Sequence, residues 1–307
     1  MQTAIRTTGG LLGLGAIALV LLATPAAATP RSGACQLDVT ASSLTWSING
    51  YNPFSTSPLS ATYTVLFHNT GESSCDFNVL VRTNDEVYGL AGAGGQSLPY
   101  TLVDSGDNLN VTPFTGVTPA NARAHLHLAA GGQQSLHYAF LVDLTQLPTD
   151  GDFEQHLLVS AEEGDGRVLG DQQIDLALNV LPSAVIGLRG AYSAAHGGAH
   201  IDLGKLTPGP ATTMLQLYVQ STGGYRVDAQ SANGGQLRLG GASRWAIPYT
   251  LVIGGHPLNL SSAAYFDAPR LSAARQDLLP IGFVIGDTSD KRAGDYEDTI
   301  TLSVTAE

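Results

Sequence analysis

Three histidines in the first half of the sequence have the side chain that most often binds metal ions. His125 and His127 are separated by one residue, and His137 lies in the next apolar segment. In an extended strand the first two would share a face, where imidazole nitrogens could ligate Zn²⁺. Leu126 and Leu128 alternate with them, however, as in a strand with one solvent face and one core face. This spacing lacks the tight pattern of zinc sites, so we predict a solvent-facing row and no metal.

Other patterns that could support catalysis or ion binding are weak. The acidic turn Glu162–Asp165 could hold Ca²⁺, but a solvated hairpin turn accounts for it equally well. The run Gly92–Gly95 does not lead from a strand into a helix, as a phosphate-binding loop does, and is interpreted as a turn. The sequence contains no serine-centred nucleophile elbow and no recognisable catalytic carboxylate pair. We therefore predict no enzyme activity, no catalytic residue and no cofactor.

Short segments that alternate between apolar and polar residues must position these side chains. Thr62–Phe67, Cys75–Val81, Ser135–Leu144 and His156–Ala161 all have this period of two, which is typical of half-buried strands. The chain also contains 36 Gly and 15 Pro, a composition that suits short strands joined by turns. The sequence therefore predicts an all-β fold.

Residues 1–28 have the organisation of a secretory signal peptide. Arg6 precedes an apolar run from Leu11 to Ala23, and three alanines at 26–28 provide a small-residue cleavage site. The apolar run is shorter than a typical membrane span. The formal net charge of −12 becomes one unit more negative once Arg6 is removed. This acidity argues against nucleic acid and anionic membranes as partners.

Cys35 and Cys75 are the only cysteines of the sequence. In the oxidising compartment beyond the inner membrane we expect them to form a disulfide. By closing the loop between them, this disulfide would stabilise the fold by about 3–4 kcal/mol in the chain-entropy description. A lipid-anchored Cys35 is disfavoured, because Ser32–Ala34 lack the aliphatic residue that precedes a lipidated cysteine and lie well past the apolar run.

The chain contains an internal repeat. Three segments recur in the same order and with similar spacing: Leu98–Val103 as Ile247–Val252, Asn108–Val111 as Pro257–Leu260, and Gly151–Glu154 as Gly294–Glu297. A repeat of this length indicates two related domains. We place the first at residues 29–181 and the second at 182–307.

The two copies differ after their last shared strand. In the first copy, Phe153–Ala161 is followed by another alternating strand, Gln172–Leu181. In the second copy, the corresponding strand carries its apolar residues, Tyr296, Ile300, Leu302 and Val304, on one face. No further strand follows it in the sequence. Its backbone donors and acceptors need a neighbour. We therefore predict that another polypeptide inserts beside these four residues.

Residues Leu44–Val81 and Ile201–Leu239 resemble the spore coat protein U domain. The resemblance is carried within these ranges by Asn49–Ser55, Leu203–Leu206 and Gln230–Leu237. It is also carried by the terminal Ala293–Ile300, which is similar to the closing motif of that family. The resemblance covers nearly all of the chain beyond the signal peptide, and the first copy is the more diverged.

Spore coat protein U domains are similar to the subunits of archaic chaperone-usher pili, which are immunoglobulin-like sandwiches lacking a final strand. The resemblance implies that a periplasmic chaperone first fills the gap. At the outer-membrane usher, the amino-terminal extension of the next subunit then replaces the chaperone by strand addition. It implies two pilin-type β-sandwiches in tandem, the first complete through Gln172–Leu181 and the second an acceptor that lacks its final strand.

A subunit inside such a fibre must also donate a strand of on the order of ten alternating residues. Residues 29–35 are too few for this, which favours a position at the pilus tip. We therefore expect a tip adhesin that is exported through the periplasm to the cell surface and acts in attachment and biofilm formation. The alternatives are an ordinary pilin or surface-coat subunit and, from another class, a secreted metal-dependent hydrolase.

A tip adhesin requires exposed contact residues on loops of its first domain. Tyr88, Leu90, Phe114 and Val117 are apolar side chains among Gly, Thr and Pro, where turns are expected. Exposed apolar clusters of this kind can mark adhesive sites. The opposite interpretation, in which these side chains fold back over the core, is equally open at this point. The ligand, whether an abiotic surface, a glycan or a protein, is also left open.

Overall fold

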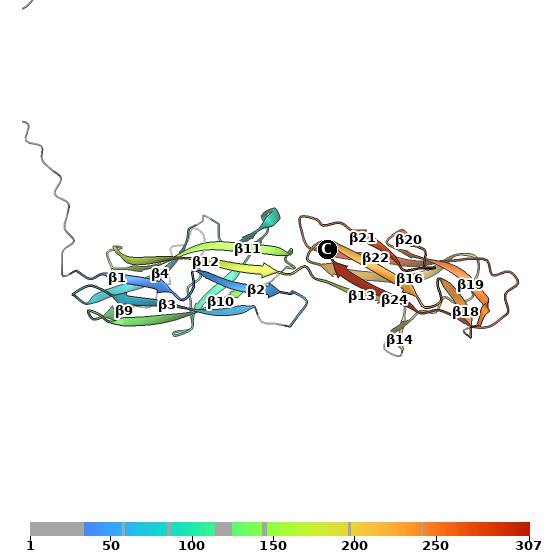
Figure 1. Cartoon of the computed structure of the whole chain (residues 1–307), viewed down its shortest axis with the longest axis horizontal. Coiled ribbons are helices and arrows are strands. Elements are labelled where there is room, and N and C mark those ends of the chain that lie inside the picture. Colours follow the sequence, from blue (N-terminus) through green and yellow to red (C-terminus); the bar gives the residue numbers. More distant parts are fainter. Residues whose placement is uncertain are drawn as a thin grey trace, which may run out of the picture. The chain divides into compact units, whose positions relative to one another are not determined.

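The computed structural model describes seven stretches of the chain: residues 34–56, 59–84, 87–113, 125–142, 146–195, 198–240 and 242–307. The predicted signal peptide and two predicted adhesive residues, Phe114 and Val117, lie outside them. The regular secondary structure of the described residues consists of strands, apart from one short 3₁₀ turn, η1, at Ala93–Gly95 (Figure 1). The predicted all-β class is confirmed. No helix within these stretches has the length and apolarity needed to cross a membrane.

The first twelve strands form two sheets. The strands of the first sheet are β1 (Leu37–Ala41), β3 (Ser60–Asn69), β10 (Gln133–Val142), β7 (Tyr100–Asp104) and β8 (Leu109–Asn110), in this spatial order. The strands of the second are β2 (Thr45–Tyr51), β12 (Val168–Val180), β11 (Gly151–Glu162), β4 (Cys75–Thr83) and β9 (His125–Leu128), again in this order. Two short strands, β5 (Leu90–Gly92) and β6 (Ser97–Leu98), extend the second sheet beside β11.

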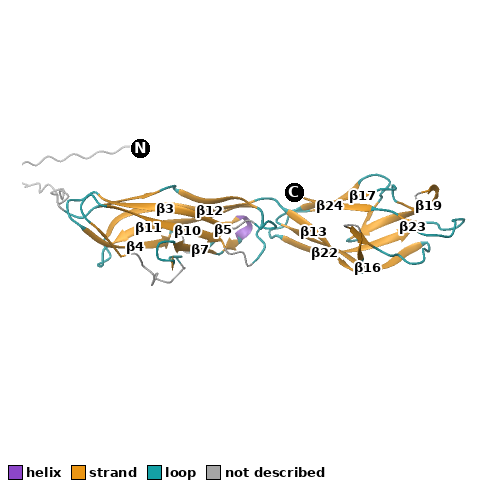
Figure 2. Ribbon diagram, turned by 90° about the horizontal axis from the view of Figure 1, so that it is seen from below, coloured by secondary structure: helices purple, strands orange, loops and turns teal. Residues whose placement is uncertain are grey.

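These two sheets enclose one hydrophobic core. Alternate residues of each strand are buried, as in β4, where Cys75, Phe77, Val79 and Val81 face inward. Trp46 is fully buried and its ring stacks on Tyr63 of the facing sheet, with centroids 5.0 Å apart. The two layers of strands are visible in Figure 2. This is the packing of a β-sandwich, in which side chains from both inner faces interdigitate.

The predicted strand Gln172–Leu181 is present as the larger part of β12. It pairs with β11 in antiparallel register, from Gly151 opposite Val180 to Glu162 opposite Val168. On its other side it pairs with β2 in parallel register. The side chains of Ile174, Leu176 and Leu178 are fully buried. The first sandwich therefore completes its own second sheet.

The remaining strands form a second sandwich with its own core. One sheet contains β13 (Ala184–Gly190), β16 (Gly209–Ser221), β22 (Arg275–Ile285), β19 (Ala242–Ile253), β18 (Gln236–Leu239) and β23 (Tyr296–Glu297), with β20 (His256–Leu258) beside β19. The facing sheet contains β21 (Ala264–Ala268), β17 (Tyr225–Ser231) and β24 (Ile300–Ala306). A separate hairpin is formed by β14 (Ser193–Ala195) and β15 (Gly198–His200). The buried residues of the second sandwich form a hydrophobic cluster distinct from that of the first sandwich.

A disulfide joins Cys35 and Cys75, as predicted, with their Cα atoms 5.2 Å apart. It ties the segment before β1 to the first residue of β4, and therefore connects the two sheets of the first sandwich. Cys75 is fully buried.

Removing this cross-link is expected to destabilise the first sandwich. The bridge closes a loop with a sequence separation of 40 residues. A Cys35→Ser, Cys75→Ser double variant should lose about 3–4 kcal/mol in urea unfolding, because its unfolded chain gains conformational freedom. Wild-type protein in reducing buffer serves as the control and should show the same loss. Unchanged stability in both samples would contradict a stabilising role.

Candidate strand-acceptor site

Strand β24 forms one edge of its sheet. Its residues pair with β17, from Ser231 opposite Ile300 to Tyr225 opposite Ala306, and within the described residues no other strand pairs with it. Strand β13 is likewise the edge of the facing sheet and pairs only with β16 in the part of the chain that is described. β13 and β24 contact each other and run side by side in both views (Figures 1 and 2). We call their outer edges the acceptor edges.

The first sandwich shows what can occupy this position. There β11 corresponds to β24 and β1 corresponds to β13 by chain order and by sheet partner. β12 pairs with β11 along its whole length and also contacts β1. The contact with β1 is close, because a Cβ atom added to Gly170 of β12 would lie 2.5 Å from the carbonyl oxygen of Leu37. The counterpart of β12 would therefore lie along both acceptor edges of the second sandwich.

The burial of equivalent side chains differs between the two sandwiches. The repeat aligns Gly151 with Gly294, which places Leu157, Val159 and Ala161 at the positions of Ile300, Leu302 and Val304. The first three are 0% exposed. The second three are only half-buried against their core. The second sandwich thus leaves an aliphatic row partly open to solvent at the place where the first one is covered.

The acceptor edge of β13 also carries a half-buried aliphatic row. Ala184, Ile186 and Leu188 of β13 are half-buried and pack against the second core. An added strand with alternating aliphatic residues would cover both rows and pair with the free backbone groups of β24. Full burial of an aliphatic side chain contributes about 1.5–3 kcal/mol, so covering the three half-buried residues of β24 is worth on the order of 3 kcal/mol. The two acceptor edges thus combine an unpaired strand edge with half-buried aliphatic rows in the described residues.

The predicted continuous strand from Tyr296 to Val304 is wrong at its centre. Tyr296 and Glu297 form the separate strand β23, which pairs with β18, while β24 begins at Ile300. Asp298 and Thr299 lie between the two strands. Tyr296 is half-buried, and its hydroxyl donates to the carbonyl oxygen of Arg292 at 2.8 Å. The acceptor edge of β24 therefore comprises Ile300, Leu302 and Val304.

The reason for this break is the carboxylate of Asp298, a residue that the sequence patterns did not single out. Its Oδ1 accepts hydrogen bonds from the backbone nitrogens of Asn233, at 3.0 Å, and Thr299, at 2.8 Å. Its Oδ2 accepts from the hydroxyls of Ser231 and, at 2.6 Å, Tyr249. Burial, and after it the hydrogen bond to Asp298, raises the pKa of Tyr249, so the phenol stays a proton donor above the pH at which tyrosine ordinarily ionises. The available signal was the position of Asp298 inside the closing motif.

Two of the predicted adhesive residues pack against the first core. Leu90 is 0% exposed, because it lies in β5 between β11 and β6 and points into the core. Tyr88 packs against the same core, and its hydroxyl accepts a hydrogen bond from the backbone nitrogen of Tyr100 at 3.1 Å. The prediction that Leu90 is a surface contact is therefore wrong, and Tyr88, which is half-buried, has its hydroxyl engaged with the backbone of Tyr100. The prediction for Phe114 and Val117 falls outside the described residues.

The three histidines do not come together. His127 of β9 bonds Asp76 of β4, with Nδ1 and Oδ1 2.8 Å apart, and His125 lies on the same exposed face. His137 is in β10 of the other sheet, where its Nδ1 lies 3.0 Å from the hydroxyl of Thr64. The described stretches contain no group of three or more His, Cys, Asp or Glu side chains placed to hold a metal ion.

The carboxylates of the predicted acidic turn are engaged by arginines. Glu162 is mostly buried and forms a bidentate ion pair with Arg82, including an Nη2–Oε2 contact of 2.9 Å. Glu163 pairs with Arg167 across the turn, and Asp165 accepts from the backbone nitrogen of Arg167 at 3.0 Å. The hydrogen bond from Arg82 lowers the pKa of Glu162. These contacts make the turn a closed structural unit.

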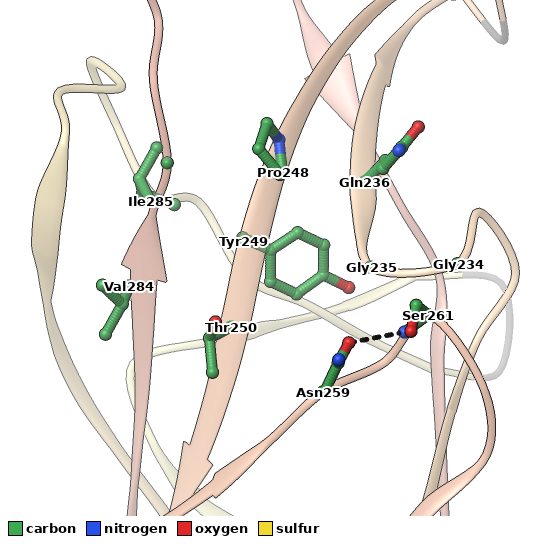
Figure 3. Close-up of a pocket in the computed structure, with 11 residues that line it drawn as sticks. Gly234, Gly235, Gln236, Pro248, Tyr249, Thr250, Asn259, Ser261, Val284 and Ile285 are labelled. Carbon is green, nitrogen blue, oxygen red and sulfur yellow. Dashed lines mark hydrogen bonds between the residues drawn. The ribbon is translucent and has the colours of Figure 1, made fainter.

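A shallow cleft of about 450 Å³ lies in the second sandwich between β18, β19 and β22 (Figure 3). Its walls are formed by small, polar and aliphatic residues: Gly234, Gly235, Gln236, Pro248, Tyr249, Thr250, Asn259, Ser261, Val284, Ile285 and Gly286. The Asn259 side-chain oxygen accepts from the backbone nitrogen of Ser261 at 3.1 Å, and the Tyr249 hydroxyl is bound to Asp298. This lining provides neither a nucleophile with a base nor a carboxylate pair.

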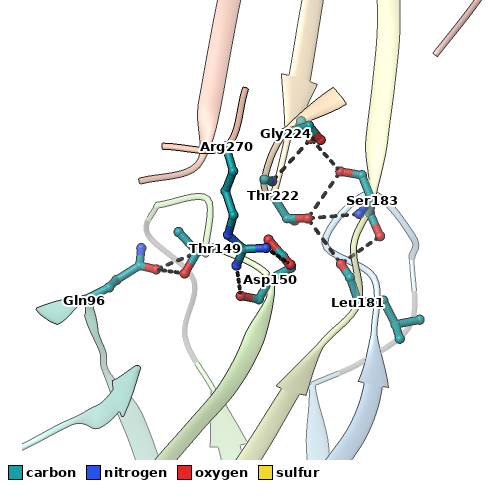
Figure 4. A network of polar contacts seen from close by, with 10 residues as sticks. Gln96, Thr149, Asp150, Leu181, Ser183, Thr222, Gly224 and Arg270 are labelled. Atoms are coloured by element: carbon teal, nitrogen blue, oxygen red, sulfur yellow. Dashed lines mark hydrogen bonds and ion pairs between the residues drawn. The ribbon is translucent and has the colours of Figure 1, made fainter. Parts of the chain in front are cut away.

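A second polar network surrounds the segment Leu181–Ser183 that follows β12 (Figure 4). The backbone nitrogen of Ser183 donates to the Thr222 hydroxyl at 2.9 Å, and that hydroxyl donates to the carbonyl of Leu181 at 3.2 Å. Nearby, Arg270 forms an ion pair with the mostly buried carboxylate of Asp150 and donates to its carbonyl at 3.0 Å. These contacts fix the segment through its backbone.

No protein-family model matches the sequence, and no curated protein matches it. Solved structures do show similarity. One is the complex of the chaperone CsuC with the tip adhesion subunit CsuE from archaic chaperone-usher Csu pili of Acinetobacter baumannii, at 13% identity and a TM-score of 0.41, covering 88% of this chain and 99% of that chain.

Two further structures are similar at comparable levels. The CupB6 tip adhesin from Pseudomonas aeruginosa has 10% identity and a TM-score of 0.41, with 88% of this chain and 95% of that chain covered. The CooA pilin subunit from enterotoxigenic Escherichia coli has 10% identity and a TM-score of 0.32, with 48% of this chain and 99% of that chain covered.

The ion pair between Arg82 and Glu162 predicts a pH dependence of the stability of the first sandwich. The pKa of Glu162 is lowered in the folded state, so its contribution is full above its ordinary value of 4.5 and is lost as the pH falls through the folded value. Glu162→Gln should cost about 1–2 kcal/mol in urea unfolding at pH 7 and clearly less near pH 3. Glu163→Gln, whose Arg167 partner is exposed, is the matched control and should change little. An equal cost of Glu162→Gln at both pH values would contradict the assignment.

Proposed function

We propose that this protein is a subunit of an archaic chaperone-usher pilus and serves as its tip adhesin. Its second sandwich accepts a strand from the next subunit, and its first sandwich contacts the surface to which the cell attaches. One observation carries the proposal. The strand position that β12 fills in the first sandwich has no counterpart among the described residues of the second, and the aliphatic rows flanking it are half-buried.

The chemistry of the acceptor edges supports a polypeptide as the ligand. Ile300, Leu302 and Val304 repeat every second residue, and the spacing matches the alternate side chains of an incoming strand. An open edge with an aliphatic row is also prone to aggregation. A protein exported in this state needs a chaperone that covers the edge until the final partner arrives, which agrees with the sequence resemblance to spore coat protein U domains.

The difference between the two sandwiches supports a terminal position over a position in the shaft. The first sandwich is closed by β12 and has a continuous core, so it needs no partner strand. A closed sandwich joined to an open one suits a subunit that extends the fibre in one direction and faces the environment in the other. Immunogold labelling separates this role from that of an ordinary pilin or coat subunit, because a tip adhesin is found only at fibre ends.

A copy of β12, the strand that completes the first sandwich, should also complete the second one. In the first sandwich β11 leads through the turn Glu163–Arg167 into β12. We expect that a second copy of residues 163–181, appended after Glu307, pairs with β24 and raises the melting temperature of the second sandwich by about 10 °C or more. Differential scanning calorimetry of the full chain measures this shift. The control is the same extension with Ser at the positions copied from Ile174, Leu176 and Leu178.

Two outcomes would count against the acceptor role. One is a monomeric protein whose second sandwich melts at the same temperature with and without the apolar extension. The other is equal stabilisation by the apolar and the Ser-containing extensions, because a true donor strand must bury its alternate side chains.

The adhesive role is tested at Phe114 and Val117, which remain the proposed contact residues. A Phe114→Ser, Val117→Ser double variant should lose at least half of cell attachment to a plastic or glass surface, with unchanged amounts of assembled pili. Tyr88→Ser is the contrasting variant. Because Tyr88 packs on the core, this change should lower stability and the amount of assembled subunit instead. Full attachment by the double variant would remove these residues from the adhesive site.

A further inference from the structure

We infer that Asp298 is a positioning residue that holds the acceptor strand β24 in place before a partner strand arrives. This inference rests on the proposed acceptor function of the second sandwich. It assigns to the carboxylate the task that β12 performs for β11 in the first sandwich, namely to secure the final strand to the rest of the fold.

Asp298 connects three separate parts of the second sandwich. Its carboxylate accepts four hydrogen bonds, from the end of β17 (Ser231), from the turn that follows it (Asn233), from β19 of the facing sheet (Tyr249) and from the adjacent Thr299. Hydrogen bonds to an ionised acceptor are about twice as strong as neutral ones. The start of β24 is thereby tied to both sheets.

The first sandwich has a different residue at this place. The alignment of Gly151 with Gly294 sets Gln155 opposite Asp298. Both residues lie where the final strand changes partner, from β5 to β4 in one sandwich and from β18 to β17 in the other. Gln155 is buried and uses its neutral amide to bind the backbone of Gly89, at 2.8 Å, and Val87, at 3.2 Å. Here β11 continues without a break and pairs with β12 throughout.

The tyrosines of the repeat report the same difference. Tyr100 and Tyr249 are equivalent residues of the Pro-Tyr-Thr-Leu-Val segment. The hydroxyl of Tyr249 donates to Asp298 at 2.6 Å. The hydroxyl of Tyr100 is buried and has no hydrogen-bond partner among the described residues. The hydrogen bond from this tyrosine to the final strand therefore exists in the sandwich with the open edge, and the described residues of the sandwich that β12 closes have no equivalent bond from Tyr100.

This arrangement has a physical reason. A strand paired on one side only opens locally with a low free energy, and a partner that binds an opened edge must first order it. Since β24 has β17 as its only ladder partner within the described residues, its start needs another anchor. The Asp298 carboxylate supplies that anchor, so the edge is ready to pair with an incoming strand.

The experiment is a coupling measurement between Asp298 and the added strand. Asp298→Asn is made in the full chain and in the chain extended by a copy of residues 163–181. Amide hydrogen exchange of β24 and β17 is then followed by mass spectrometry. In the unextended chain we expect the variant to speed up exchange about tenfold or more, and in the extended chain about threefold or less, because the added strand then holds β24.

Three variants control the measurement. Asp295→Asn removes an exposed carboxylate from the same segment and should leave exchange within about twofold of wild type. Tyr249→Phe deletes a single donor and should act in the same direction as Asp298→Asn, but less, which keeps the test valid if the Asn variant folds poorly. Tyr100→Phe removes a buried hydroxyl without a described partner and should leave β11 exchange unchanged or slower.

The possible results separate the two proposals. If exchange in Asp298→Asn speeds up equally with and without the extension, Asp298 is an ordinary structural residue and the inference is wrong, although the acceptor function stands. If the extension fails to slow exchange of β24 in the wild-type chain, the acceptor function itself is wrong.

Discussion

The structure depends on one constraint, which is that the backbone donors and acceptors of a strand need partners on both sides. Within a sheet this pairing is automatic, but the last strand of a sandwich has one unpaired edge. The first sandwich satisfies the edge of β11 with its own β12, which is also paired with β2. The second sandwich leaves β24 and β13 as edges in its described residues. The same fold is thus closed in one half of the chain and open in the other.

This difference determines how deeply the aliphatic side chains of β11 and β24 are buried. When β12 is in place, Leu157 and Val159 disappear completely from solvent; without such a strand, Ile300 and Leu302 remain half-buried. Because half-buried aliphatic residues hold a strand less firmly, the open sandwich needs another way to fix it. The Asp298 carboxylate, with donors from β17, β19 and the turn at Asn233, provides polar contacts at that place. Apolar cover and a charged tie are alternative solutions to the same problem.

Most of the fold was accessible from the sequence, because period-two alternation and the internal repeat both reflect backbone geometry directly. Strand β12, the Cys35–Cys75 bridge and the asymmetry between the two copies followed from these signals. The interruption of the final strand did not, because a period of two does not reveal that the Asp298 carboxylate accepts from four backbone and side-chain donors. Leu90 was misplaced for a related reason. Flanking glycines suggest a surface loop, whereas pairing of β5 with β11 draws the residue into the core.

The short connection between β11 and β12 has a consequence for how many partners the chain can take. Glu163–Arg167 is a tight turn, so β12 is present at β11 at an effective concentration far above that of any separate polypeptide. A foreign strand cannot compete with it, and the first sandwich is unavailable for exchange. Under the proposed function, the described part of the chain therefore offers one acceptor sandwich. In the proposed pilus, strand exchange would proceed from the second sandwich only, which would give the fibre a single direction of growth.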